Sequence, residues 1–203
     1  MAQQLHPLEY YRQELRHLPP TFRTRDGKLL YARLIRPEDA PLLLELFERL
    51  SSETRHRRFH ADADHVSEER KQQVAQQLAS VDNRTGGGAV LALERTPDGR
   101  EHIVGVARLA RAEGQPYAPE AEAAIVVRDD YQGRGVGTEL LRRLGLLAKQ
   151  MCVTSVLAVI EAHNVRALRV FRNMELPYAV ATRRGETQMT IQVPQIGFDN
   201  PSL

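Results

Sequence analysis

The chain has 203 residues, of which 42% are hydrophobic, and a formal net charge of +2. This length suits one domain with a substantial core. No apolar run approaches the roughly twenty residues of a membrane span, and the first residues lack the apolar core of a signal peptide. The charge is small and the arginines are not interleaved with aromatic residues, which argues against nucleic-acid binding.

A single cysteine, Cys152, excludes an internal disulfide framework and a Cys-rich zinc site. One cysteine also fits a reducing compartment. We therefore expect a cytoplasmic protein with no membrane partner and no bound metal, and we expect Cys152 to be a small core residue.

The order of the elements follows from apolar periodicity, which is two in strands and near 3.6 in helices. Residues 1–24 mix aromatic and apolar residues with charges and predict a helical arm, which leaves 25–194 as one domain and 195–203 as a loose tail. The predicted elements are a strand at 29–36, helices at 37–50 and 67–79, strands at 89–94, 102–110 and 121–127, a helix at 135–152, a strand at 155–159, a helix from Asn164, and a hairpin of 178–183 and 187–193.

Two details of this order bear on function. The strand at 155–159 follows a helical crossover, so we expect it to be parallel to the strand at 121–127. The segment Arg55–His60 concentrates basic residues next to Phe59. We interpret it as a solvated connector, and the alternative is that it lines an acceptor site or recognises an acidic partner.

The stretch from Val127 to Thr138 has glycines at alternate positions, Gly133, Gly135 and Gly137. Glycine permits backbone conformations in which successive N–H groups point into one concavity. The helix that follows adds the positive end of its dipole and unpaired amides. The pattern predicts a cradle for a diphosphate, although a purely structural turn remains the alternative. Neither the dinucleotide fingerprint nor a Walker motif fits, because Thr138 stands where the former needs glycine.

This loop and the order of elements over residues 26–193 resemble the GNAT superfamily of N-acetyltransferases. Four further stretches resemble the bacterial Pat-type protein lysine acetyltransferases: Asp26-Gly27, Arg36–Asp39, Arg57–Phe59 and Ala121-Glu122. The resemblance implies an α/β (α+β) fold. It consists of a mixed, mostly antiparallel sheet of six to seven strands, with a splayed parallel pair, at 121–127 and 155–159, and about four flanking helices.

The resemblance also implies that acetyl-coenzyme A is the co-substrate. Main-chain groups of Ile125, Val126 and Val127 would pair with its pantetheine arm, and Asn164 would bond the same arm. Read without the family, Asn164 is a helix cap. Arg134 would add charge near the nucleotide, and Phe171 would lie near the co-substrate. The residues expected to hold the diphosphate are Gln132, Gly133, Arg134, Gly135, Val136, Gly137 and Thr138.

The chemistry requires a base, because a lysine ammonium has a reference pKa near 10.4. Glu122 aligns with the general base of the Pat-type enzymes, and we expect partial burial to raise its pKa. A surface ion pair is the alternative reading of Glu122, and Glu161 is the rival base. The backbone N–H of Val127 would stabilise the oxyanion.

One position departs from the family. Many GNAT enzymes have a tyrosine that protonates the leaving thiolate, and Phe171 stands there instead. Phenylalanine cannot donate a proton, so the general acid is in doubt. Tyr178 is a conceivable substitute, although it is not at the matching position.

The leading hypothesis is an N-acetyltransferase that acts on a protein lysine, with an acyl-coenzyme A synthetase as one possible substrate, through direct attack in a ternary complex. A small-molecule amine is the competing acceptor. A regulatory module that binds coenzyme A without transferring anything is the alternative from another class. Either a monomer or a homodimer is compatible with the sequence.

Overall fold

The structure is a computed structural model that describes residues 19–59, 66–174 and 176–194. Most of the predicted arm, residues 1–18, and the predicted tail, residues 195–203, lie outside the described residues. Within the described residues, no helix is long and apolar enough to cross a membrane.

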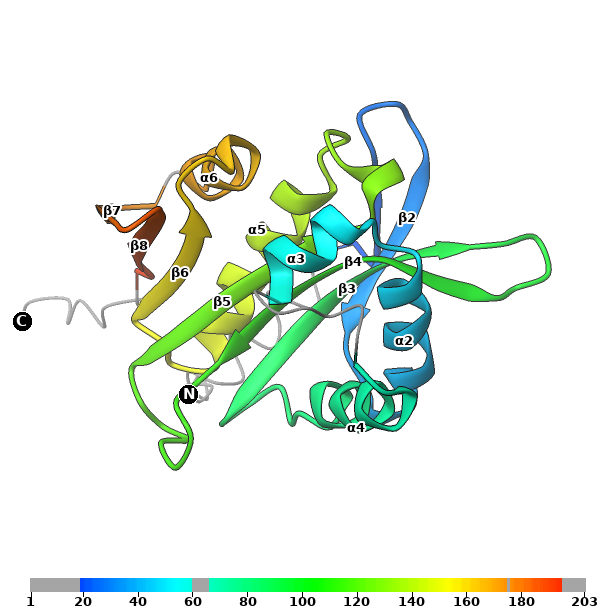
Figure 1. The fold of residues 1–203 in the computed structure, drawn as a ribbon, viewed down its shortest axis with the longest axis horizontal. Helices are drawn as coiled ribbons and strands as arrows, with labels where there is room; N and C mark the ends of the chain where they lie inside the picture. Colours follow the sequence, from blue (N-terminus) through cyan, green and yellow to red (C-terminus); the bar gives the residue numbers. More distant parts are fainter. Residues whose placement is uncertain (1–18, 60–65, 175, 195–203) are drawn as a thin grey trace, which may run out of the picture.

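One mixed sheet organises the domain (Figure 1). Its eight strands lie in the order β1-β2-β3-β4-β5-β6-β8-β7. Neighbouring strands are antiparallel except for β5 and β6, which are parallel as expected. The strands are β1 (Thr21–Arg23), β2 (Leu29–Leu34), β3 (Gly87–Arg95), β4 (Glu101–Ala110), β5 (Glu120–Val127), β6 (Ser155–Glu161), β7 (Tyr178–Arg183) and β8 (Glu186–Gln192).

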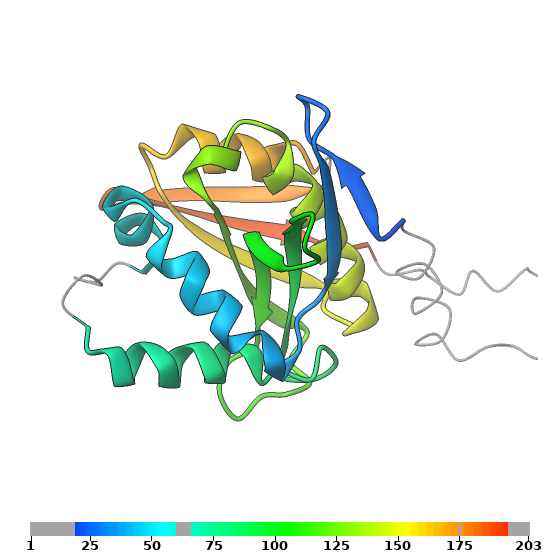
Figure 2. The ribbon, with the colours of Figure 1, turned by 90° about the vertical axis from the view of Figure 1, so that its right-hand side faces the viewer.

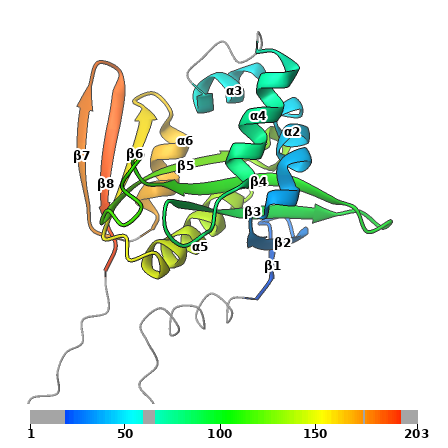
Figure 3. The same ribbon diagram turned by 90° about the horizontal axis from the view of Figure 1, so that it is seen from below.

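Helices cover both faces of this sheet (Figures 2 and 3). Helix α2 (Ala40–Glu48) and helix α4 (Glu68–Ala79) pack together on one face, and α3 (Ser52–Phe59) lies against β5 on the same side. Helix α5 (Val136–Gln150) packs on β3 and β4 from the other face and contacts α6 (Val165–Arg172). Short 3-10 turns, η1 (Pro37–Asp39) and η3 (Asp129–Tyr131), precede α2 and the glycine loop.

Helix α5 shows why this arrangement is stable. Its apolar stripe places Leu140 and Leu147 at 0% exposure against the sheet, and each buried leucine side chain contributes about 1.5–3 kcal/mol. Gly105 of β4 makes room for this contact, since a Cβ there would come within 2.9 Å of Leu140 Cδ1. The helix therefore fixes the glycine loop at its own N-terminus to the centre of the sheet.

Three local predictions differ from the structure. Thr21–Arg23, assigned to the arm, pair with β2 as an edge strand, so the sheet has eight strands instead of six or seven. The segment after Ser51 is a helix, α3, instead of a connector. Cys152 is exposed and has a φ of 56°, because it ends α5 in the left-handed conformation, and it is not a core residue.

The parallel pair is splayed. Only Glu120, Ala121 and Glu122 of β5 pair with β6, opposite residues 155–157. Beyond that point β5 stays with β4, whereas β6 continues along β8. Figure 1 shows the two strands diverging toward their C-terminal ends. The C-terminal half of β5 therefore has a ladder on one side alone.

Candidate active site

The direction of the main chain decides which groups of β5 face the gap. The amide of Arg128 donates to the carbonyl of Val104 in β4 at 2.9 Å, and successive amides of a strand point to opposite sides. Ile125 and Val127 therefore direct their N–H groups toward β6. The N–H of Val126, which lies opposite Val106, points toward β4 instead. Of the three residues predicted to offer main-chain groups, two have the required direction.

The glycine loop lies at the end of this gap. Gly133 has a φ of 75° and Gly135 a φ of 90°, values that side chains with a Cβ rarely adopt. Gly135 is the N-cap of α5 and carries no side chain that could fill the capping position. The first amides of α5 have no partner within the helix, so they can bind an anion. The conformation required by the predicted cradle is present.

A cavity of about 160 Å³ joins the gap to the loop. Gly137 lines this cavity, and a Cβ there would be in ordinary contact, 3.5 Å from both Ile125 Cδ1 and Val170 Cγ1. The lining residues come from α3, β5, the glycine loop and α6: Thr54, Arg57, Arg58, Ile125, Val126, Val127, Tyr131, Gln132, Gly133, Gly137, Asn164, Arg166, Ala167 and Val170.

Two predicted residues point elsewhere. The guanidinium of Arg134 pairs with Asp26 at 2.7 Å, across the turn between β1 and β2. Phe171 is 4% exposed and belongs to the core cluster under α5. Its side chain does not line the cavity of about 160 Å³. In this structure α6 turns Phe171 toward the sheet, and a contact between Phe171 and the co-substrate stays a prediction.

Three of the predicted loop residues lie outside the cavity wall. The side chain of Val136 is buried in the core, at 1% exposure. Gly135, Val136 and Thr138 do not line the cavity, although all three belong to the N-terminus of α5. They can contribute main-chain amides alone, which is the role that the loop pattern predicts.

Asn164 combines both readings of its position. Its Oδ1 accepts a hydrogen bond from the amide of Ala167 at 3.1 Å, so Asn164 caps α6. The same residue lines the cavity. Because the cap uses Oδ1, the amide nitrogen Nδ2 is the atom that can donate to a ligand.

Glu122 lies at the last residue of β5 that pairs with β6. Its side chain is exposed, so the expected partial burial is not found. Strand alternation places it on the sheet face that carries Ala124 and Val126, which is the face of α2, α3 and α4. Arg58 of α3 interacts with it electrostatically.

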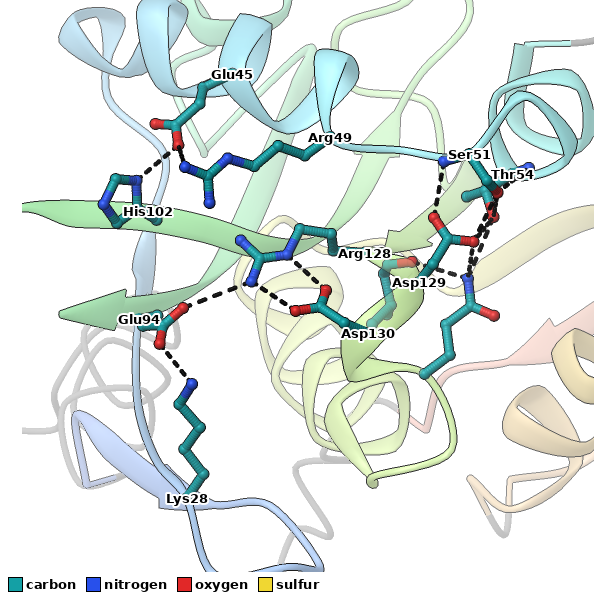
Figure 4. A network of polar contacts seen from close by, with 12 residues as sticks. Lys28, Glu45, Arg49, Ser51, Thr54, Glu94, His102, Arg128, Asp129 and Asp130 are labelled. Atoms are coloured by element: carbon teal, nitrogen blue, oxygen red, sulfur yellow. Dashed lines mark hydrogen bonds and ion pairs between the residues drawn. The ribbon is translucent and has the colours of Figure 1, made fainter. Parts of the chain in front are cut away.

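Helix α3 is held in place by a polar network around Asp129 (Figure 4). The Asp129 carboxylate accepts hydrogen bonds from the Ser51 amide at 2.9 Å and from the hydroxyls of Ser51 and Thr54 at 2.7 and 2.6 Å. Burial alone would raise the pKa of Asp129, but these hydrogen bonds outweigh it and hold the pKa below its usual value. Ser51 Oγ in turn accepts from the Thr54 amide at 3.2 Å, so Ser51 caps α3 and the carboxylate of η3 holds that cap in place.

Gln132 extends this network into the gap. Its Nε2 donates to the carbonyl of Val127 at 3.1 Å and lies 3.3 Å from the Thr54 hydroxyl. The end of β5, the glycine loop and α3 are therefore joined by one amide side chain. Next to it, the Arg128 guanidinium bonds Asp130 at 2.6 and 2.8 Å, and this ion pair lowers the pKa of Asp130 (Figure 4).

Glu161, the rival base, ends β6 on the far side of the gap. Its Oε2 is 3.9 Å from Arg57 Nε and 3.3 Å from His163 Nε2. The side chain is 17% exposed and joins α3 to the start of α6. Tyr178, the suggested substitute acid, lies on the exposed strand β7 and does not line the cavity.

The sequence did not identify the contribution of α3 to the site. Arg57 and Arg58 were noted for their charge, but the helix that carries them was not predicted. Thr54, Arg166 and Val170 had no pattern that marked them. Among the described residues, no group of three or more His, Cys, Asp or Glu side chains could hold a metal ion.

A family model described as an acetyltransferase (GNAT) domain matches residues 30–176. The acetyltransferase PA5475 of Pseudomonas aeruginosa is 32% identical to this chain over 146 residues, which cover 71% of this chain and 72% of that protein.

Solved structures show the same architecture. The GNAT domain of S. lividans PAT matches with a TM-score of 0.71 at 25% identity, over 85% of this chain and 95% of that chain. A cAMP-binding acyltransferase from Mycobacterium smegmatis matches with a TM-score of 0.58 at 22% identity, over 93% of this chain and 52% of that chain, a likeness of fold. The chain therefore belongs to the GNAT family of acetyltransferases, whose co-substrate is acetyl-coenzyme A.

Proposed function

We propose that the protein transfers an acetyl group from acetyl-coenzyme A to the ε-amine of a protein lysine, by direct attack in a ternary complex. One observation carries the proposal. Ile125 and Val127 direct amides into a gap that no described strand fills, beside a loop in which Gly133 and Gly135 have positive φ and which leads into the N-terminus of α5. We place the reaction in the cytoplasm.

Each part of this site has a task in binding the co-substrate. The loop from Gln132 to Thr138 holds the diphosphate through main-chain donors. Ile125 pairs with the amide-rich arm in the manner of an added strand, and Asn164 Nδ2 donates to the arm, which leaves the N–H of Val127 for the thioester oxygen. The N–H of Val127 stabilises the charge that develops on the thioester oxygen during attack.

Glu122 takes the proton that the lysine ammonium must lose before its nitrogen attacks. Glu122 lies on the face of α2, α3 and α4, at the closed end of the gap where the pairing of β5 and β6 stops. Its exposure allows a water molecule to relay the proton. The carbon–nitrogen bond forms as the carbon–sulfur bond breaks, and the thiolate leaves. With Phe171 buried, water supplies the proton to sulfur.

The choice of a protein lysine rests on the Pat-type stretches of the sequence and on the match to the GNAT domain of S. lividans PAT. Arg57-Arg58-Phe59, one of these stretches, lies on α3 and lines the cavity at Arg57 and Arg58. An acyl-coenzyme A synthetase is the substrate that the same resemblance suggests. To test that suggestion, a purified synthetase is incubated with the protein and labelled acetyl-coenzyme A, and the acetylated lysines of the synthetase are counted.

A small-molecule amine is the second candidate acceptor. It is favoured by an apolar cavity of about 200 Å³ between the sheet and α2, α3 and α4. Competition between a lysine peptide and a panel of apolar amines for the same labelled donor distinguishes the two acceptors.

Glu122→Gln tests the mechanism directly. General-base catalysis contributes roughly a hundredfold to ten-thousandfold, so we expect kcat to fall by that range while the Kd for acetyl-coenzyme A is unchanged. Glu120→Gln is the matched control, since Glu120 is exposed on the same strand and the same face. Equal turnover in the two variants would remove Glu122 from the mechanism.

A further inference from the structure

A second cavity lies beside the first. It has a volume of about 200 Å³ and lies between α2, α3, α4 and one face of the sheet. Its walls are almost entirely apolar, with Leu43, Phe47, Val74, Leu78 and Val126 among them. Three cationic residues also line it, Arg58, Lys71 and Arg108, and Lys71 is paired with Glu48 and Glu68.

The register of β4 and β5 places charges of both signs on this face. Arg108 is opposite Ala124, and Glu122 is opposite Ala110. Residues opposite each other share a face, so Arg108 and Glu122 are diagonal neighbours at the edge of the cavity. Arg108 keeps its guanidinium there by donating to the carbonyl of Leu78 at 2.9 Å.

Arg58 approaches the same place from α3. It lines the cavity at the gap as well as the apolar cavity, and Val126 is the other residue that does so. These two residues therefore mark the boundary where the reacting ends of the co-substrate and the acceptor must meet. Glu122, the proposed base, is on the acceptor side of that boundary.

Among the described residues, 19–59, 66–174 and 176–194, neither Arg58 nor Arg108 forms an ion pair, and Glu122 is the carboxylate that attracts Arg58. Desolvation lowers the pKa of Arg58, and it lowers the pKa of Arg108 to about 10 with help from the charge of Arg58. Two half-buried cations beside one carboxylate favour a bound anion.

We propose that the apolar cavity holds the part of the acceptor next to the reacting lysine, and that this part carries a carboxylate bound by Arg58 and Arg108. The inference rests on the proposed lysine acetylation. The pattern of charge fits such a segment: the ammonium lies by Glu122, the neighbouring carboxylate by the two guanidinium groups, and an adjoining apolar side chain in the cavity.

The test compares peptides in pairs. Each pair has one lysine and an apolar residue, and differs in a single Glu or Gln placed one to three residues from the lysine on either side. A charged hydrogen-bonded contact changes affinity by roughly tenfold or more, so we expect kcat/KM to favour the best Glu peptide over its Gln partner by about that factor, mainly through KM.

The arginine variants assign the preference. Arg108→Gln and Arg58→Gln should each bring the Glu/Gln ratio of kcat/KM close to one, and Arg108→Lys should retain part of it. Arg100→Gln is the control, because Arg100 is 79% exposed in the hairpin turn far from the cavity. Thermal unfolding of each variant checks that the fold is retained. If Arg108→Gln does not fold, the Glu/Gln ratio is measured with Arg108→Lys.

The outcomes separate this inference from the proposed function. If lysine peptides are acetylated in a Glu122-dependent reaction with no preference for Glu, the acidic subsite is wrong and lysine acetylation stands. If no lysine peptide reacts but free apolar amino acids do, and Arg108→Gln abolishes that reaction, the lysine acceptor is wrong. A Glu preference that survives both glutamine variants overturns the assignment to Arg58 and Arg108.

Discussion

The two sides of β5 recognise their ligands by different means. On the side of α5 and α6, the gap and the glycine loop offer main-chain amides, and the required features are glycines, a strand end and a helix N-terminus. On the side of α2, α3 and α4, the cavity is lined by side chains brought from three helices and two strands. The strand end and glycine loop of the first side are neighbours in sequence, although α3 and α6 also line that cavity, whereas the second side is assembled entirely from distant segments.

This difference has a physical basis. A diphosphate and an amide-rich arm can be bound by groups that every residue possesses, so the chain needs the correct backbone conformation and little else. An acceptor must be distinguished from other amines, which requires side chains of particular shape and charge. Substitutions on the donor side should therefore act through backbone or steric effects, and those on the acceptor side through individual polar contacts.

The largest expected effect comes from filling the donor gap. Gly137→Ala places a Cβ at ordinary contact distance, 3.5 Å from Ile125 and Val170, and it favours the helix, so donor affinity should change little. Gly137→Leu adds three further carbons that occupy part of the cavity of about 160 Å³, so the leucine and the donor compete for the same space. Since overpacking costs roughly 1–3 kcal/mol, the Kd for acetyl-coenzyme A should rise by up to about a hundredfold, as measured by calorimetry.

Circular dichroism of both Gly137 variants provides the control for folding. If the leucine variant binds the donor as tightly as the alanine variant, the gap is not the donor site. The contrast between the two sides of β5 would then have no basis.

A smaller effect is expected from releasing α3. Asp129→Asn removes the charge that accepts hydrogen bonds from Ser51 and Thr54. Such a cap contributes about 1–2 kcal/mol, so the free energy of unfolding should fall by that amount. Because α3 carries Arg58, the KM for the acceptor should rise by roughly tenfold. The Kd for the donor should change less, since α3 supplies only part of the wall of the donor cavity.

Asp130→Asn is the matched control for this variant. Asp130 lies in the same turn, η3, but bonds Arg128 instead of α3. It should weaken stability without changing the acceptor KM. Equal changes in donor and acceptor binding for Asp129→Asn would show that the network does not act on the acceptor side alone.

The smallest expected effect is the dependence of stability on pH. The pKa values of Asp129 and Asp130 are lowered from the usual 3.8 in the folded protein, so the unfolded state binds more protons in acid. The stabilisation is present at neutral pH and is lost as the pH falls below roughly 5 and through the folded pKa. Urea unfolding should therefore show the difference between the wild type and Asp129→Asn shrinking as the pH falls. A constant difference from pH 6 to pH 3 would contradict this.

Much of the donor side could be predicted from the sequence. Alternation and helical spacing identified β5, α5 and β6, and the glycines identified the loop between them, because these are properties of neighbouring residues. The parallel pairing of β5 and β6 followed from the crossover helix. The same reasoning placed Asn164 at a helix start, where it caps α6.

Other features required the folded chain. Helix α3 has few apolar residues, and its cap residue Ser51 is held by Asp129, 78 residues away in sequence, so its own stretch does not reveal it. Arg134 pairs with Asp26 across 108 residues. The exposure of Glu122 and the burial of Phe171 depend on which faces β5 and α6 turn to the core.

The amino-acid sequence by itself determined the order of elements, the glycine loop and the family, because local backbone preferences and residue spacing specify them. Tertiary structure alone decided how far β5 and β6 pair before they diverge. It also decided which arginines gather near Glu122. The reason is that side chains from distant segments meet only once the sheet has set their separation. That separation cannot be derived from the residues of any single segment.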